Sequence, residues 1–134
     1  MSVKNIGPKS DAVVIGIDFG DVKNGLALGH VQTKTAVGLK SSSTTELHEN
    51  LTQLVKENNV ISFVVGLPYN LSHGETARTE KTYKLIELLQ TWFTIPVEII
   101  DERWTTKEAK KRSPKGDDDQ GAAILITQTY LDSL

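Results

Sequence analysis

The sequence contains no cysteine, which excludes disulfide scaffolds, thiolate zinc sites and cysteine nucleophiles. It also lacks a long apolar run, since no stretch approaches the roughly 20 residues of a membrane span. Its first ten residues are polar and have no apolar core of the kind found in a secretory signal. We expect those ten residues to be flexible, and the absences together predict a cytoplasmic protein without a membrane association.

The chain has the size and composition of one globular domain. Its 134 residues are 38% hydrophobic and 24% charged, which is typical of soluble domains. A domain of this length buries roughly two-thirds of the surface of its unfolded chain, so it needs no covalent or metal cross-link to fold. We therefore expect residues 1–134 to form a single domain.

The net charge of −2 by itself argues against a nucleic-acid partner, but the charge is unevenly distributed. The segment from Arg103 to Lys115 has six basic residues and one acidic residue, so it carries +5 and the rest of the chain carries −7. Because salt confines the field of each charge to about 10 Å, a basic segment can contact phosphates even on an acidic protein. On charge alone, a solvated helix face or loop is the simpler interpretation of this segment.

The first half of the chain has the pattern of three strands followed by a helix. Apolar runs predict strands at residues 12–19, 26–30 and 35–39. The dipeptide Asn24-Gly25 predicts the turn of the first hairpin, because both positions tolerate a positive φ. Ser43-x-x-Glu46 has the pattern of a capping box, placed in a turn at residues 41–45, and the leucines after it predict a helix to about Asn59.

The second half alternates strands and helices. We expect strands at residues 60–65 and 96–101, a helix with a broad apolar face between them, a short basic helix opened by Thr105-x-x-Glu108, and a last helix that begins at the acids 117–119. Right-handed crossovers then give an α/β fold. The predicted sheet is mixed and five-stranded, with three antiparallel strands, two parallel strands and helices on both faces.

Carboxylates occur at three places where a strand ends or a helix begins. Asp18 shares a strand face with Val14 and Gly16, and burial there is costly unless the carboxylate accepts hydrogen bonds from the following turn or binds a cation. Asp101 and Glu102 point to opposite faces of their strand. One of the two is expected beside Asp18, and the spacing does not say which.

The third acidic cluster is Asp117 to Asp119, at the start of the last helix. Helix capping is its simplest role. Three acidic sites at strand ends and at a helix start also suit hard cations that bind through oxygen ligands. Two such ions can activate water and stabilise the leaving oxygen in phosphodiester hydrolysis.

Four blocks, taken in order, resemble the YqgF-type nuclease family, which was first described as Holliday junction resolvases. The blocks are GIDFGDVKNGLALG from Gly16, VVGLPYNLSHGETAR from Val64, DERWTT from Asp101 and DQGAAILITQTYLD from Asp119. Bacterial members of this family are associated with processing of the small-subunit ribosomal RNA precursor. The resemblance implies a ribonuclease-H-like fold and a nuclease dependent on Mg²⁺ or Mn²⁺. It also implies that Asp18, Glu102 and Asp119 are the catalytic, metal-binding carboxylates and that Asp101 is structural.

Basic residues are the candidate contacts to nucleic acid. Lys23 and Arg78 lie in the matched blocks, although Arg78 could instead pair with Glu75 or Glu80. The remaining candidates are in the basic segment: Lys107, Lys110, Lys111, Arg112 and Lys115. They would hold flanking phosphates without reading the bases.

The chain departs from the family at two points. The first motif of the family commonly reads D-x-G-x-K, but Val22 stands at the lysine position and Lys23 follows it. A one-place shift in a hairpin turns a side chain to the other face. The segment between Glu102 and Asp119 is also about ten residues shorter than the family pattern, so Asp117 or Asp118 is an alternative third ligand.

The leading hypothesis is a metal-dependent nuclease that processes the 5′ end of precursor 16S rRNA during ribosome biogenesis. The expected partner is structured RNA rather than branched DNA, and the expected protein is a monomer or homodimer. Two alternatives are a Holliday junction resolvase and a non-catalytic nucleic-acid-binding module on the same fold.

Overall fold

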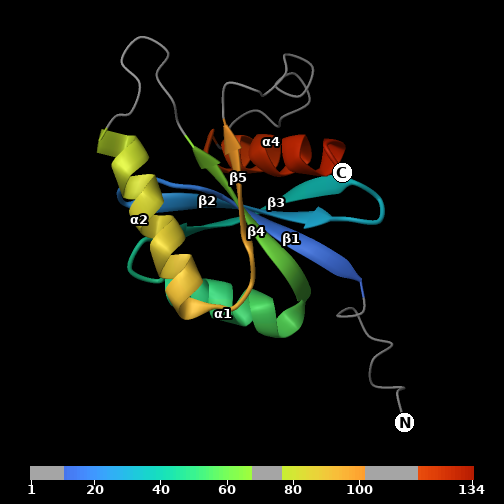
Figure 1. The fold of residues 1–134 in the computed structure, drawn as a ribbon, viewed down its shortest axis with the longest axis horizontal. Coiled ribbons are helices and arrows are strands. Elements are labelled where there is room, and N and C mark those ends of the chain that lie inside the picture. Colours follow the sequence, from blue (N-terminus) through green and yellow to red (C-terminus); the bar gives the residue numbers. More distant parts are fainter. Residues whose placement is uncertain (1–10, 68–76, 102–117) are drawn as a thin grey trace.

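A computed structural model describes residues 11–67, 77–101 and 118–134, with the backbone alone at 77–78 and 118–120. Its core is one five-stranded mixed sheet of order β3-β2-β1-β4-β5 (Figure 1). The elements are β1 (Ala12–Asp18), β2 (Lys23–His30), β3 (Thr35–Ser43), α1 (Leu47–Glu57), β4 (Asn59–Leu67), α2 (Ala77–Trp92), β5 (Val97–Asp101) and α4 (Asp118–Asp132). The predicted fold class is confirmed: β1, β2 and β3 pair antiparallel, and β4 and β5 extend the sheet in parallel.

The alternating apolar residues of β1 divide the core into two clusters. Val13, Ile15 and Ile17 pack against α1 and α2 on one face of the sheet. Val14 packs with residues of α4 on the other face, where the helix contacts mainly β1, β2 and β3 and lies on the side of the sheet opposite to α1 (Figure 1). Helices therefore cover both faces, as the sequence predicts. No helix in the described ranges combines the length and apolarity needed to cross a bilayer.

The helix α4 lies very close to the sheet, because glycines leave room for it. A Cβ added at Gly16 would stand 1.7 Å from Thr127 Oγ1, and one at Gly29 would stand 2.7 Å from Thr127 Cγ2. Thr127 is fully buried, and its hydroxyl donates to the carbonyl of Ala123 at 2.7 Å within the helix. These contacts fix the position of α4 along β1 and β2.

The first hairpin differs from the prediction in its turn. Asn24 and Gly25 lie inside β2, where Gly25 pairs with Asp18, so the turn is made by the residues before them. Asn24 is fully buried, and its amide makes tertiary hydrogen bonds that a local turn preference does not reveal.

Two element boundaries also differ from the prediction. The strand β3 continues through the predicted turn to Ser43, past an irregularity in its pairing with β2. The predicted capping box does not open α1, because Glu46 is the residue before the helix. Ser43 Oγ nevertheless accepts from the Glu46 N–H at 3.2 Å and donates to its carboxylate at 3.1 Å, so the pair closes the turn instead.

Candidate active site

Asp18 is the last residue of β1 and is partly buried. Strand alternation from Val14 and Gly16 places its side chain on the α4 face of the sheet. Its neighbours on the two adjacent strands are glycines, which have no side chains. On β2, Gly25 pairs with Asp18; on β4, Gly66 comes directly after the residue that pairs with Ile17. The carboxylate of Asp18 is therefore at the carboxyl end of a central strand, flanked in the sheet by two residues without side chains.

The fifth strand resolves which face each of its residues occupies. Ile100 is buried in the cluster under α4, whereas Ile99 is 44% exposed. Alternation places Asp101, the last residue of β5, on the face opposite to Ile100 and Asp18. Asp101 is thus on the wrong face to join Asp18, and Glu102 lies outside the described residues.

The helix α4 runs antiparallel to β1, with its first turn toward Asp18. Leu131 packs in one cluster with Val14, and the carbonyl of Ala123 lies 3.3 Å from a Cβ built at Gly16. Four residues of an α-helix rise about 6 Å, which is close to the rise of two strand residues and therefore to the step from Gly16 to Asp18. One further turn reaches position 119, which lies in the first turn of α4. The side chains of Asp118 and Asp119 lie outside the description, as does Asp117.

No three carboxylates or imidazoles come together among the side chains that the structure describes. Asp18 supplies the hard oxygen donor that Mg²⁺ and Mn²⁺ prefer. The two glycines that flank it in the sheet place no side chain beside it. The described part of this edge is therefore compatible with such an ion. The side chains of the other two predicted ligands, Glu102 and Asp119, lie outside the description.

The predicted nucleic-acid contacts are only partly described. Lys23 is exposed at the start of β2, two residues before Gly25, and so shares the α4 face with Asp18. Val22 precedes the strand and is 79% exposed, so strand alternation does not govern it. Arg78 has a described backbone in α2 but no described side chain. The five candidates in the basic segment lie outside the described residues: Lys107, Lys110, Lys111, Arg112 and Lys115.

A buried polar network behind Asp18 was not predicted. Asn24 Oδ1 accepts from the Gly20 N–H at 3.2 Å, and Asn24 Nδ2 donates to the Ser42 carbonyl and to Thr44 Oγ1, each at 3.4 Å. Thr44 Oγ1 in turn donates to the Asp21 carbonyl at 3.1 Å. The network fixes the turn after Asp18 against the end of β3. One signal in the sequence could have revealed it: Asn24 is a polar residue two positions before Leu26, so strand alternation places it on the same buried face.

We expect Asn24→Ala to destabilise the protein by about 2 kcal/mol, because the substitution leaves the Gly20 N–H and the Ser42 carbonyl without their buried partner. Urea unfolding measures the loss. Asn50→Ala is the matched control: Asn50 is exposed and donates one hydrogen bond, to Ser42 Oγ at 2.8 Å, so its cost should stay below about 1 kcal/mol. Equal costs for the two variants would contradict the role given to Asn24.

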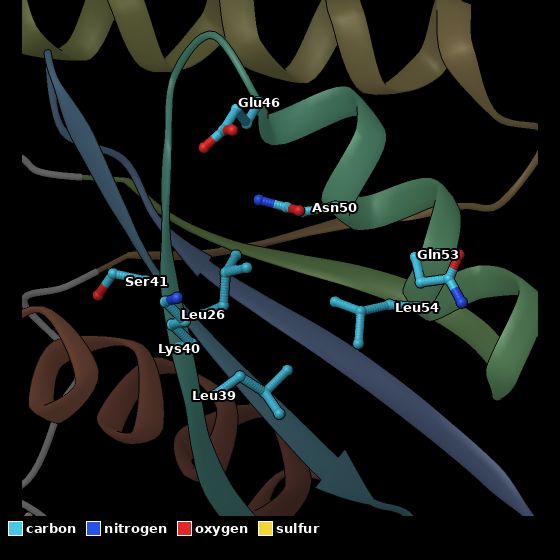
Figure 2. Close-up of a pocket in the computed structure, with 8 residues that line it drawn as sticks. All are labelled: Leu26, Leu39, Lys40, Ser41, Glu46, Asn50, Gln53 and Leu54. Carbon is cyan, nitrogen blue, oxygen red and sulfur yellow. The ribbon is translucent and has the colours of Figure 1, made fainter.

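A cavity lies away from this edge of the sheet. Figure 2 shows it between α1 and β3, with a volume of about 460 Å³. Leu26, Leu39 and Leu54 supply its apolar surface, and Asn50 and Gln53 supply amides. Because all three leucines pack against the cluster under α1 and α2, this cavity opens on the face opposite to Asp18. It plays no part in the carboxylate site.

Comparisons with known proteins identify the family of the chain. The family model of RuvX, described as Holliday junction resolvase, matches residues 12–133. A protein of Ligilactobacillus salivarius named "Putative pre-16S rRNA nuclease" is 34% identical over 135 residues, covering 90% of this chain and 92% of the relative. A protein of the same name from Lacticaseibacillus casei is 36% identical and covers 90% of this chain and 94% of the relative.

Solved structures confirm the ribonuclease-H-like fold. RuvC of T. thermophilus in complex with a Holliday junction substrate has a TM-score of 0.65 at 15% identity, covering 91% of this chain and 94% of that chain. A second Thermus thermophilus RuvC structure has a TM-score of 0.62 at 14% identity, covering 90% and 95%. Identities this low speak for the fold alone. The matched family model and the two relatives above 30% identity, each along nine-tenths of the chain, show that this protein belongs to the RuvX family.

Proposed function

We propose that the protein is a metal-dependent nuclease of the cytoplasm that hydrolyses phosphodiester bonds in structured RNA, with 5′-end processing of precursor 16S rRNA as its task. The observation that carries the proposal is the position of Asp18. Its carboxylate is at the carboxyl end of a central strand, between two glycines of the neighbouring strands, on the face of the sheet that α4 covers. The names of the relatives point to the same substrate.

The proposed metal ligands are Asp18, Glu102 and Asp119. Ile100 supports Glu102 over Asp101, because alternation continued by one residue beyond the described strand would return to the face of Asp18. The backbone of α4 supports Asp119, because its first turn lies at the Asp18 end of the helix. A divalent ion held by these oxygens would lower the pKa of water and neutralise charge on the leaving group.

The protein side of the reaction is then mainly positioning. The Asn24 network fixes the turn that follows Asp18, and the close packing of Thr127 on Gly16 fixes α4. Lys23, on the face of Asp18, would contact a phosphate near the scissile bond. Arg78 and the basic segment would hold flanking phosphates, which gives an affinity that falls with salt.

The test compares two substrates for the purified protein with Mg²⁺ or Mn²⁺: a 5′-extended precursor 16S rRNA fragment and a four-way DNA junction. We expect the RNA to be cut at least about 10-fold faster, a difference of roughly 1.4 kcal/mol in barrier, and EDTA to stop the cleavage. Faster cleavage of the junction would assign the site to branched DNA instead. RNA binding that persists in EDTA, with no hydrolysis at any metal concentration, would show a non-catalytic binding module.

A further inference from the structure

A second, smaller pocket lies beside the turn after Asp18, on the opposite face of the sheet. It has a volume of about 260 Å³ and lies between the end of β1, the start of α1 and one side of α2. Phe19 forms part of its wall and packs against the cluster under α1 and α2. Because Phe19 directly follows Asp18 in the chain, the pocket and the candidate active site are on either side of the same strand end.

The pocket offers aromatic and aliphatic surface to a flat ring. Phe19 and Trp92 line it together with Leu88, whose side chain is 46% exposed. The Trp92 ring is held from one side by His48, with ring centroids 4.6 Å apart and planes inclined by 31°. A rigid tryptophan beside an open apolar wall is the kind of surface on which nucleobases stack.

The charge around the pocket is positive. Lys81 and Lys84 both line it, and none of its described lining residues is acidic. Lys81 binds Asp21 at 2.8 Å, whereas Lys84 makes no ion pair or hydrogen bond with any described residue. The free ammonium group of Lys84 is thus available to a phosphate. An apolar protein segment would cover the apolar wall but would leave the ammonium group of Lys84 without a partner.

We infer that this pocket receives one unpaired nucleobase of a nucleic-acid strand, stacked on Trp92, with the phosphate of that nucleotide bound by Lys84. The inference rests on the proposed function, which identifies the bound strand as part of the RNA substrate. It narrows the class of substrate to RNA with a single-stranded stretch beside the cleaved bond. The strand would pass the end of β1, with a phosphate near Asp18 and a base turned to the other side of Phe19.

The test uses the fluorescence of Trp92 in the full chain. Trp104→Phe leaves Trp92 as the only tryptophan, and Asp18→Asn with EDTA keeps the probe intact. The probes are a short oligoadenylate and an oligomer of the same length in which every base is removed. We expect saturable quenching by the oligoadenylate and about 10-fold weaker binding of the abasic oligomer, the loss that one stacked base typically causes. Equal binding and equal quenching by the two probes would overturn the inference.

A charge-matched pair of variants tests the phosphate contact. Lys84→Gln should reduce the slope of log affinity against log salt by about one, whereas Lys56→Gln, in the last turn of α1, should leave it unchanged. An equal effect of both would contradict the contact.

A change in Trp92 emission on dilution of the protein alone would show that a second copy fills the pocket, and would also overturn the inference. The test measures binding without cleavage. A negative result therefore contradicts the role of the pocket and not the proposed nuclease activity, whereas a wild type that cleaves no RNA contradicts the nuclease activity and not the pocket.

Discussion

Asp18→Asn is expected to lower the rate of RNA cleavage by about 10³-fold or more while the protein stays folded. The substitution removes the anionic donor at the centre of the proposed metal site, and the charge stabilisation that a catalytic ion supplies is worth several kcal/mol, at 1.36 kcal/mol per tenfold in rate. The side chain keeps its shape and is only partly buried, so the packing of β1 should not change. Single-turnover cleavage and circular dichroism measure the two effects.

The matched control for this variant is Asp11→Asn. Asp11 is exposed and lies immediately before the other end of β1, so its substitution removes the same charge at a distance from the site. Cleavage by this control should stay within about twofold of the wild type, because its distance from the site leaves only screened interactions. Undiminished cleavage by pure Asp18→Asn protein would remove Asp18 from the reaction.

Gly16→Ala is expected to cause the largest loss of stability. The new Cβ would stand 1.7 Å from Thr127 Oγ1 and 3.0 Å from Thr127 Cβ, both in a buried interface. The helix α4 would have to move away from the sheet, at a cost of about 3 kcal/mol or more. For a chain of this length the melting temperature should fall by roughly 10 °C, as thermal unfolding followed by circular dichroism would show.

Thr127→Ala provides the control for this clash. Alone, it removes the Oγ1 that donates to the Ala123 carbonyl and should cost about 1 kcal/mol. Combined with Gly16→Ala, it removes the atom closest to the new methyl group, so the double variant should be more stable than the sum of the single losses predicts, by about 1–3 kcal/mol. Strictly additive losses would show that the two residues do not limit the approach of α4.

The sequence predicts the sheet because its strands have a strong and local pattern. The alternation of Val13, Ile15 and Ile17 with Val14 and Gly16 is visible without any tertiary information, and the structure places the two sets in separate clusters. The order of strands and helices then leaves few topologies. The expectation of a five-stranded mixed sheet with helices on both faces depends on these two facts, and the structure bears it out.

What the sequence did not predict depends on contacts between distant segments. The turn was misplaced because Asn24 is a good turn residue locally, whereas its amide binds Ser42 in β3 and Thr44 just after that strand. The ion pair between Lys81 and Asp21 joins residues 60 positions apart.

The candidate site shows the same division between local and distant information. The sequence left Asp101 and Glu102 as alternatives, since alternation within one strand does not say which face is covered. The buried contact of Ile100 with α4 excludes Asp101 from the face of Asp18.

A calorimetric titration with Mn²⁺ is the most direct test of a metal site shared by the strand ends. It should be made on the wild type, on Asp18→Asn and on Glu102→Gln, with Asp101→Asn as the control on the opposite face. We expect saturable binding in the wild type and in Asp101→Asn, and its loss in both other variants. Binding that survives both substitutions, or a wild type that binds no Mn²⁺, would contradict the site.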